Sequence, residues 1–277
     1  MAKLTIPELK QRKGPGSLVM LTAYDYPTAK LAAEAGVDVL LVGDSLGMVV
    51  LGYDSTVPVT LEEMLHHTAA ARRGAPDVHL VADLPYLADA TPERALAAAE
   101  RLVKEAGADS VKLEGPKLEV VRALVRAGVP VLGHVGLTPQ TASSLGGYKV
   151  QGRSPAAAKK LLEDALALED AGAWGVVLEM VPRQLAALVT EQLGVPTIGI
   201  GAGADTDGQV LVFHDLIGVF DRFKPKFVRR YLEGGALIRE AIEAYAADVR
   251  AGAFPEVGHA YEMDEEALEG LYGKGEA

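Results

Sequence analysis

The sequence predicts an α/β fold in the form of a (β/α)₈ TIM barrel, and two recurring patterns lead to it. Short continuous apolar runs, typical of strands buried on both faces of a parallel sheet, alternate with amphipathic helical segments along the 277 residues. Many of the helical segments end in an Ala-Gly pair, as at Ala35-Gly36, Ala106-Gly107 and Ala171-Gly172. Glycine just past a helix end readily adopts the left-handed conformation that stops the helix, so the repeating unit is helix, glycine, strand and loop.

The elements follow one another in a regular order. The predicted strands are residues 18–22, 38–43, 78–83, 109–114, 130–134, 174–179, 196–200 and 209–213. The predicted helices between them are residues 27–35, 60–72, 92–106, 117–127, 155–171 and 182–193. Such alternation implies parallel strands joined by right-handed helical crossovers. Eight strands in a chain of this length favour a closed barrel, and a doubly wound open sheet is the alternative.

The two ends of the chain add helices to this plan. A short helix near residues 7–13 is expected to plug the bottom of the barrel, and residues 226–250 are predicted to form a long helix. Residues 256–275 are acidic, with room for a further helix, and no Pro- or Ser-rich linker divides the chain. We therefore expect a single barrel domain over residues 1–277, with 226–277 as a C-terminal helical extension.

Charge and composition exclude several classes of protein. The formal net charge is −11 and the basic residues are dispersed, whereas nucleic-acid binding needs clustered Lys and Arg. The absence of Cys excludes disulfides, thiolate metal sites and a Cys nucleophile. No apolar run reaches about 18 residues and the first residues lack a signal-peptide apolar core, so we expect a cytoplasmic protein without a membrane span.

Three acidic residues, Asp44, Asp83 and Glu114, end the second, third and fourth predicted strands. In an α/β barrel the carboxyl ends of the strands form the rim that carries the active site. Carboxylates gathered there repel one another strongly unless a divalent cation lies between them. All-oxygen ligands with room for water and substrate favour Mg²⁺, with Mn²⁺ as a substitute. The alternative is that these acids cap helices or pair with Lys and Arg.

Lys112 and Glu179 complete the charged groups of this rim. Lys112 lies two residues before Glu114, so both side chains point to the same face of the strand, here the barrel interior. Lys112 could bind a substrate carboxylate, form a Schiff base or serve only in an ion pair, and a nearby metal favours anion binding over the imine. Glu179 ends the sixth strand before the apolar Met180-Val181, surroundings that suit a general base. The structural alternative for Glu179 is to cap or pair with the next helix.

Other features of the rim leave two readings open. Ser45, directly after Asp44, could hold an anion through its hydroxyl and backbone N–H. His134 ends the fifth strand, where it either contacts substrate or satisfies a hydrogen bond in the core. Residues 137–153 form a long Gly-, Ser- and Thr-rich connection that is either a lid or a surface insertion. The Gly-rich turn at 198–203 either binds phosphate or permits close backbone packing.

Seven stretches of the chain, taken in order, resemble the ketopantoate hydroxymethyltransferase family. They are TAYD at 22–25, GDSLGM at 43–48, ADLPY at 82–86, VKLEG at 111–115, GHVGLTPQ at 133–140, GGYKVQGR at 146–153 and IGIGAG at 198–203. The resemblance runs over nearly the whole chain, and the stretches that diverge are the surface helices and the C-terminal tail. Several long motifs in the right order make a chance match improbable.

The resemblance implies roles for residues already singled out. It implies a barrel of the phosphoenolpyruvate/pyruvate superfamily type with one Mg²⁺ per subunit, held by Asp44, Asp83 and Glu114. It implies that the substrate 3-methyl-2-oxobutanoate is bound by Asp44, Ser45, Asp83 and Lys112. Glu179 would then be the proton acceptor.

The resemblance also implies a reaction. A hydroxymethyl group would pass from the co-substrate 5,10-methylenetetrahydrofolate to the oxo acid through a Mg-stabilised enolate. The product would be 2-dehydropantoate, on the route to pantothenate and coenzyme A. Members of the family are usually large homo-oligomers, so the resemblance favours a decamer.

Two other functions compete with this interpretation. One is a Mg-dependent lyase or mutase of the same barrel superfamily, but such enzymes commonly use a Cys on a lid loop, and this chain has none. The other is an inactive barrel that binds a metabolite as a scaffold or sensor. The presence of Glu179 together with all three rim acids argues against an inactive protein.

Overall fold

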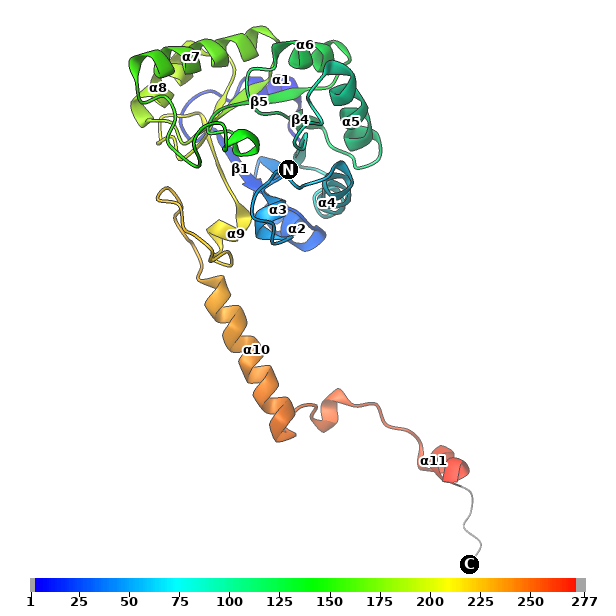
Figure 1. Cartoon of the computed structure of the whole chain (residues 1–277). Helices are drawn as coiled ribbons and strands as arrows, with labels where there is room; N and C mark the ends of the chain where they lie inside the picture. Colours follow the sequence, from blue (N-terminus) through cyan, green and yellow to red (C-terminus); the bar gives the residue numbers. More distant parts are fainter. Residues whose placement is uncertain (1–2, 273–277) are drawn as a thin grey trace, which may run out of the picture.

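The chain folds into a closed barrel of eight parallel strands, seen in a computed structural model that describes residues 3–272 (Figure 1). Each strand pairs with the next, and the eighth pairs with the first, with Leu18 opposite Gly208. This closure excludes the open sheet, which would leave its first and last strands unpaired, so the (β/α)₈ prediction is confirmed. The strands are β1 (Leu18–Thr22), β2 (Val39–Val42), β3 (His79–Asp83), β4 (Ser110–Lys112), β5 (Val131–Gly136), β6 (Gly175–Glu179), β7 (Thr197–Ile200) and β8 (Gly208–Leu211).

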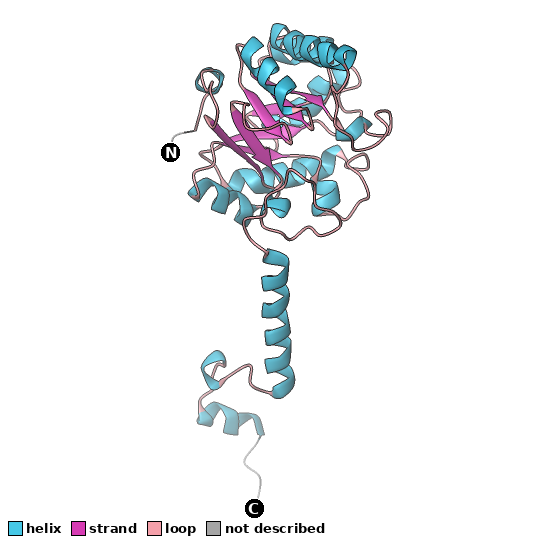
Figure 2. Cartoon of the chain, turned by 90° about the vertical axis from the view of Figure 1, so that its left-hand side faces the viewer, coloured by secondary structure: helices cyan, strands magenta, loops and turns pink. Residues whose placement is uncertain are grey.

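Six helices surround the strands, close to the predicted positions (Figure 2). They are α2 (Tyr26–Glu34), α4 (Leu61–Gly74), α5 (Pro92–Lys104), α6 (Leu118–Arg126), α7 (Pro155–Asp170) and α8 (Arg183–Gln192). Several begin at a side-chain cap: Thr60 and Ser154 each accept a backbone N–H three residues on. The loops after β2 and β5 hold two short turns, α3 (Leu46–Val49) and the 3₁₀ turn η1 (Pro139–Thr141).

Apolar side chains pack on both sides of the strands, as expected for a parallel sheet covered by helices. The outward cluster, which includes Leu40 and Val176, packs beneath the helices. The inward cluster fills the barrel and includes Leu41 and Val81. Leu9 from α1 (Ile6–Lys10) is fully buried in this inward cluster, so the predicted plug at the amino-terminal end is confirmed.

The C-terminal part leaves the barrel after the short helix α9 (Phe213–Leu216). Helix α10 (Gly234–Ala251) projects away from the barrel, and η2 (Val257–His259) and α11 (Glu265–Tyr272) follow it (Figure 1). The prediction of a helix from residue 226 was wrong, because residues 226–233 fold back on α9. Tyr231 N–H donates to Leu216 O, and Gly234 N–H donates to Ile217 O. These backbone groups therefore bond to a distant part of the chain instead of to a helix of their own. The assignment of 226–277 as an extension of a single domain stays a prediction.

No helix within residues 3–272 combines the length and the apolar character needed to cross a bilayer.

Candidate active site

A cavity of about 100 Å³ lies at the carboxyl-terminal mouth of the barrel and gathers the predicted site residues. Its polar part comes from β2 to β5 and the loops that follow them, with Asp44, Ser45, Thr56, Asp83, Lys112, Glu114 and His134. Its apolar part comes mainly from β6 to β8, with Val177, Ile200, Val210, Leu211 and Val212. Glu179, on β6, also lines the cavity. The sequence prediction that these groups share one rim is therefore correct.

Asp83 links two of its neighbours. Lys112 lies opposite it on β4, and the Lys112 Nζ atom is 2.8 Å from Asp83 Oδ1, with both side chains almost fully buried. The backbone N–H of Asp44 donates to Asp83 Oδ2 at 3.1 Å. A side chain at position 43 would crowd this contact, since a Cβ there would lie 3.4 Å from Asp83 Oδ2 and 2.9 Å from Ser45 Oγ. Gly43 thus lets the β2 backbone approach Asp83 closely.

Gln140 is the second link in the site. It lies in η1, at the start of the long connection 137–153, and is 4% exposed. Its Nε2 donates to Asp44 Oδ2 at 2.8 Å and to Leu84 O at 2.9 Å. Its backbone N–H donates to Glu114 Oε2 at 3.0 Å. One residue therefore ties two of the three rim carboxylates together.

Burial and mutual repulsion favour the protonated form of two of the acids in the cavity. Burial, followed by the negative charge of Asp83, raises the pKa of Asp44 to about 7. Burial also raises the pKa of Glu114 well above its usual value, and Asp44 adds to this effect. Burial opposes the charge of Lys112, yet Asp83 and Glu114 outweigh it and hold the Lys112 pKa above its usual range. Lys112 is therefore a permanent cation here and a poor Schiff-base nucleophile.

Glu179 faces His134 across the cavity. The His134 Nε2 atom is 3.3 Å from Glu179 Oε2, and its Nδ1 atom is 3.8 Å from Glu114 Oε1. Burial lowers the pKa of His134, so its ring is neutral at pH 7. Beside them Gly136 has φ of 100°, and a Cβ there would clash with the carbonyl of Glu179. Only glycine lets the end of β5 pack this closely on Glu179.

Ser45 and the loop 137–153 border the mouth of the cavity. The Ser45 and Tyr24 hydroxyls are 2.8 Å apart. Tyr148, in the loop, has its hydroxyl 3.8 Å from Met48 Sδ on α3, so the loop reaches across to the β2 side. Burial raises the Tyr148 pKa, and the charge of Glu179 adds to it. These contacts favour the lid interpretation over a surface insertion.

The donor set suits Mg²⁺, although the acids are not already arranged as a metal centre. Among residues 3–272, no three His, Asp or Glu side chains are placed to hold one ion together. Asp83 turns to Lys112, and Gln140 holds Asp44 and Glu114. The chemistry nevertheless fits, because Asp44, Asp83 and Glu114 are three buried carboxylates that share one cavity, and carboxylate oxygens are ligands that Mg²⁺ prefers. The Mg²⁺ assignment stays a prediction.

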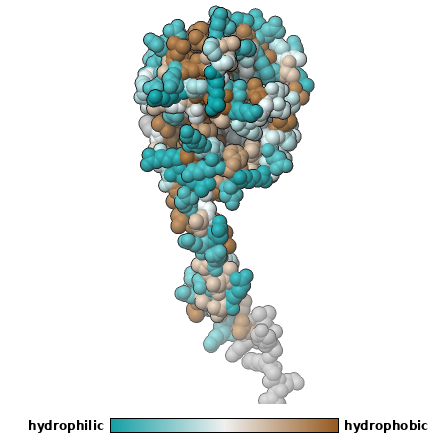
Figure 3. Space-filling model, turned by 60° about the vertical axis from the view of Figure 1, so that its left-hand side comes forward, coloured by the Kyte–Doolittle hydropathy of each residue, from teal (hydrophilic) through white to brown (hydrophobic). Residues whose placement is uncertain are grey.

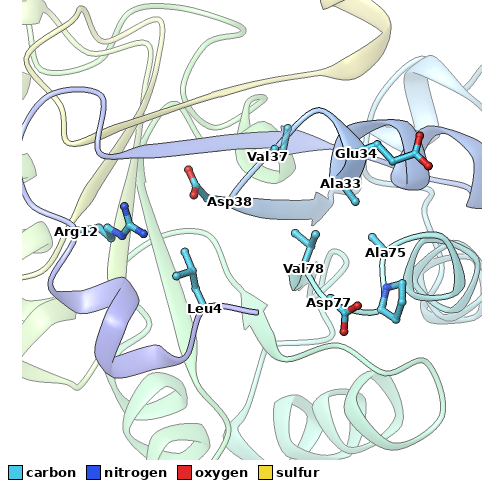
Figure 4. Close-up of a pocket in the computed structure, with 11 residues that line it drawn as sticks. Leu4, Arg12, Ala33, Glu34, Val37, Asp38, Ala75, Asp77 and Val78 are labelled. Atoms are coloured by element: carbon cyan, nitrogen blue, oxygen red, sulfur yellow. The ribbon is translucent and has the colours of Figure 1, made fainter. Parts of the chain in front are cut away.

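A larger hollow of about 510 Å³ lies at the other end of the barrel (Figure 4). It is formed by α1 and the segments that precede β2 and β3, including Arg12, Glu34, Asp38 and Asp77. None of the rim acids contributes to it. Its charged side chains are exposed or half-buried, whereas those of Asp44, Asp83 and Glu114 are buried, so we place the chemistry at the smaller cavity.

Two residues of the site were not predicted from the sequence. Gln140 and Thr56 line or brace the cavity, and neither follows a strand directly, so the strand-end pattern gave no sign of them. In the Gly-rich turn at 198–203, two glycines pack closely against neighbouring side chains, and phosphate binding there stays a prediction. A Cβ at Gly201 would meet the ring of Phe227, and one at Gly203 would meet Arg183.

Comparison with known proteins agrees with this geometry. The family model described as ketopantoate hydroxymethyltransferase matches residues 3–257. The chain belongs to this family. A protein of Thermus thermophilus named 3-methyl-2-oxobutanoate hydroxymethyltransferase is 69% identical over 259 residues, which cover 93% of this chain and 99% of that protein. A protein of the same name from Carboxydothermus hydrogenoformans is 55% identical over 276 residues, covering 98% of this chain and all of that protein. The family prediction, and with it the prediction of an enzyme, is confirmed.

Two solved structures have a fold similar to that of this hydroxymethyltransferase family member. The structure of 2,3-dimethylmalate lyase, a member of the PEP mutase/isocitrate lyase superfamily, matches with a TM-score of 0.60 and 18% identity, covering 97% of this chain and 90% of that one. Phosphonopyruvate hydrolase in complex with oxalate and Mg²⁺ matches with a TM-score of 0.58 and 14% identity, covering 91% and 89%. At these identities the likeness shows the fold alone, which is the predicted type of α/β barrel.

Proposed function

We propose that this enzyme transfers a hydroxymethyl group from 5,10-methylenetetrahydrofolate to 3-methyl-2-oxobutanoate, giving 2-dehydropantoate on the route to pantothenate and coenzyme A. The observation that carries the proposal is that Asp44, Asp83, Lys112 and Glu179 line one small buried cavity. The names of its relatives support the choice of substrate. A cavity with one polar and one apolar part suits an oxo acid with a carboxylate at one end and a branched alkyl group at the other.

The polar part would hold the carboxylate and keto groups. Lys112 keeps its charge and would pair with the substrate carboxylate, with the Ser45 hydroxyl as a further donor. Asp44, Asp83 and Glu114 would hold one Mg²⁺, which when bound polarises the carbonyl of the oxo acid and so acidifies the adjacent carbon. The apolar side chains of Ile200 and Val212 would face the two methyl groups.

Glu179 would then remove the proton from the carbon that carries the methyl groups. Its side chain is 16% exposed, so water has limited access to it, and the His134 Nε2 atom lies 3.3 Å from Glu179 Oε2. A base held in place within contact distance of the reacting carbon gains its effect from orientation. The enolate carbon would then bond to the methylene carbon of the folate as one C–N bond of that carbon breaks, and the released nitrogen would take the proton from Glu179. One water would break the second C–N bond, leaving its hydroxyl on the methylene carbon and its proton on the nitrogen, so that 2-dehydropantoate and tetrahydrofolate are released.

Glu179→Gln is the variant that tests this proposal. The amide has the same shape but cannot accept a proton, so we expect proton exchange at C3 to slow by about 10²- to 10⁴-fold while the oxo acid still binds. Deuterium incorporation at C3, followed by NMR without folate, measures the step, and calorimetry measures binding. Glu191→Gln, on the exposed side of α8, is the control. Wild-type exchange in the Glu179 variant would remove this residue from the mechanism.

The competing functions give different results in the same experiment. A lyase or mutase would cleave or rearrange its own substrate without folate, and an inactive scaffold would show neither exchange nor turnover. Turnover of 3-methyl-2-oxobutanoate that depends on methylenetetrahydrofolate separates all three functions.

We also propose that the enzyme is a homo-oligomer, a decamer by resemblance to its family. In the barrel, outward side chains such as Leu40 and Val176 are fully buried beneath helices. Val19, on the outward face of β1, is instead 51% exposed, because only the four-residue α9 follows β8 before the chain departs. This uncovered seam between β8 and β1 is a place for a helix from another subunit.

The helix that leaves the barrel offers a matching surface. Helix α10 carries an apolar set that is about half exposed: Leu237, Ile238, Ile242, Tyr245 and Val249. Figure 3 shows apolar residues along the stem that α10 forms below the barrel. Exposed apolar surface of this extent marks a contact with another protein. We propose that α10 of a second copy contacts this molecule. We also propose that the protein is located in the cytoplasm.

A further inference from the structure

The base of the loop 137–153 is anchored more firmly than its position on the surface suggests. Thr138 and Thr141 hydroxyls are 2.6 Å apart across η1, and the Thr141 N–H donates to Thr138 O. The Gln140 side chain between them points inward and is almost fully buried. The N–H groups of a buried side-chain amide normally form hydrogen bonds. The groups that accept these bonds therefore indicate what the Gln140 side chain does.

Those partners come from three consecutive strand ends. Asp44 follows β2, Leu84 follows β3 and Glu114 follows β4. Gln140 donates to all three, through Nε2 to Asp44 Oδ2 and Leu84 O and through its backbone to Glu114 Oε2. Both Nε2 hydrogens are used, and each carboxylate has one oxygen held while its second oxygen stays available.

The geometry points to Gln140 as a positioning residue for the divalent-cation site, fixing Asp44 and Glu114 so that their second oxygens can serve as ligands. This inference rests on the proposed Mg²⁺ site. Carboxylates that repel one another need such donors to hold a common geometry before the ion arrives. Without the side-chain amide, Asp44 would be free to turn from the site, and Leu84 O would lose its partner.

Mg²⁺ titration of Gln140→Met tests the inference. Methionine keeps the length of the side chain but donates no hydrogen bond, and the backbone bond to Glu114 survives. We expect the Kd for Mg²⁺, measured by calorimetry without substrate, to rise by about 10-fold or more. Activity should recover when Mg²⁺ is raised in proportion, which a general loss of packing would not allow.

Two further variants keep the test decisive. Gln151→Met is the matched control, since Gln151 lies in the same loop but its Nε2 bonds only Lys149 O. Gln140→Asn retains the amide on a shorter arm that reaches Asp44 less well, and it should also weaken binding if Gln140→Met fails to fold. A wild-type Kd in a folded Gln140 variant would overturn the inference. Failure of the wild-type protein to bind Mg²⁺ would instead contradict the proposed metal site.

Discussion

The barrel buries most of its apolar side chains, whereas the helix α10 leaves its apolar side chains about half exposed. On β2 the four residues Val39–Val42 are all buried, shared between the barrel interior and the surrounding helices. On α10 only Gly234 is buried, and the apolar residues Leu237 and Ile242 are 52% and 60% exposed. Apart from the seam between β8 and β1, the barrel buries its apolar side chains within one subunit, whereas α10 does not. The proposed assembly would therefore use α10 and the β8–β1 seam, while the proposed catalytic cavity lies within the barrel.

The barrel side of this comparison is tested most strongly by Leu9→Ala. Leu9 is fully buried in the inward cluster, so removing its side chain leaves a cavity, and we expect a loss of about 2–5 kcal/mol in the free energy of unfolding. Urea denaturation measures the change. Leu166→Ala on α7, where Leu166 is 37% exposed, is the control and should cost much less. Equal losses for the two would show that α1 does not close the core.

A titratable group in the barrel should make its stability depend on pH. Burial lowers the pKa of His79 to about 4, against 6.5 when exposed, and its ring nitrogens contact Ser110 Oγ and Leu4 O. Between pH 4 and pH 6.5, His79 therefore binds a proton in the unfolded chain but not in the folded chain. The free energy of unfolding that depends on neutral His79 is fully present above pH 6.5. It falls by up to about 3 kcal/mol as the pH drops towards 4.

His79→Gln isolates this contribution. We expect the variant to show a smaller loss of unfolding free energy than the wild-type protein between pH 6.5 and 4, measured by urea denaturation at each pH. Parallel curves for the two proteins would mean that His79 is protonated in the folded state, and that the amino-terminal end of the barrel is wetter than its burial indicates.

The α10 side of the comparison is tested by Ile242→Asp. A charge on this apolar face should dissociate the proposed assembly, yet change the free energy of unfolding of the separated barrel by less than about 0.5 kcal/mol, because Ile242 is 60% exposed within its own subunit. Light scattering after size exclusion measures the mass. Glu243→Gln, a neighbouring exposed position, is the control. An assembly that survives Ile242→Asp would show that α10 is not its contact.

Much of the site could be read from the sequence because it depends on local pattern. A continuous apolar run such as 39–42 predicts a buried strand, and parallel strands bring their carboxyl ends together whatever the rest of the chain does. Asp44, Asp83, Lys112 and Glu179 were placed at one rim on that argument alone. Their chemical roles came from the family resemblance, because a charged residue at the end of a strand does not identify the substrate.

Only the tertiary structure decided which groups contact one another. Gln140 reaches Asp44 across 96 positions of sequence, and it does so because barrel closure brings the loop after β5 over the end of β2. The pairing of Lys112 with Asp83 and the late start of α10 at Gly234 likewise depend on neighbours distant in the chain. Periodicity determines which faces are buried, and packing determines the partner that each polar group finds there.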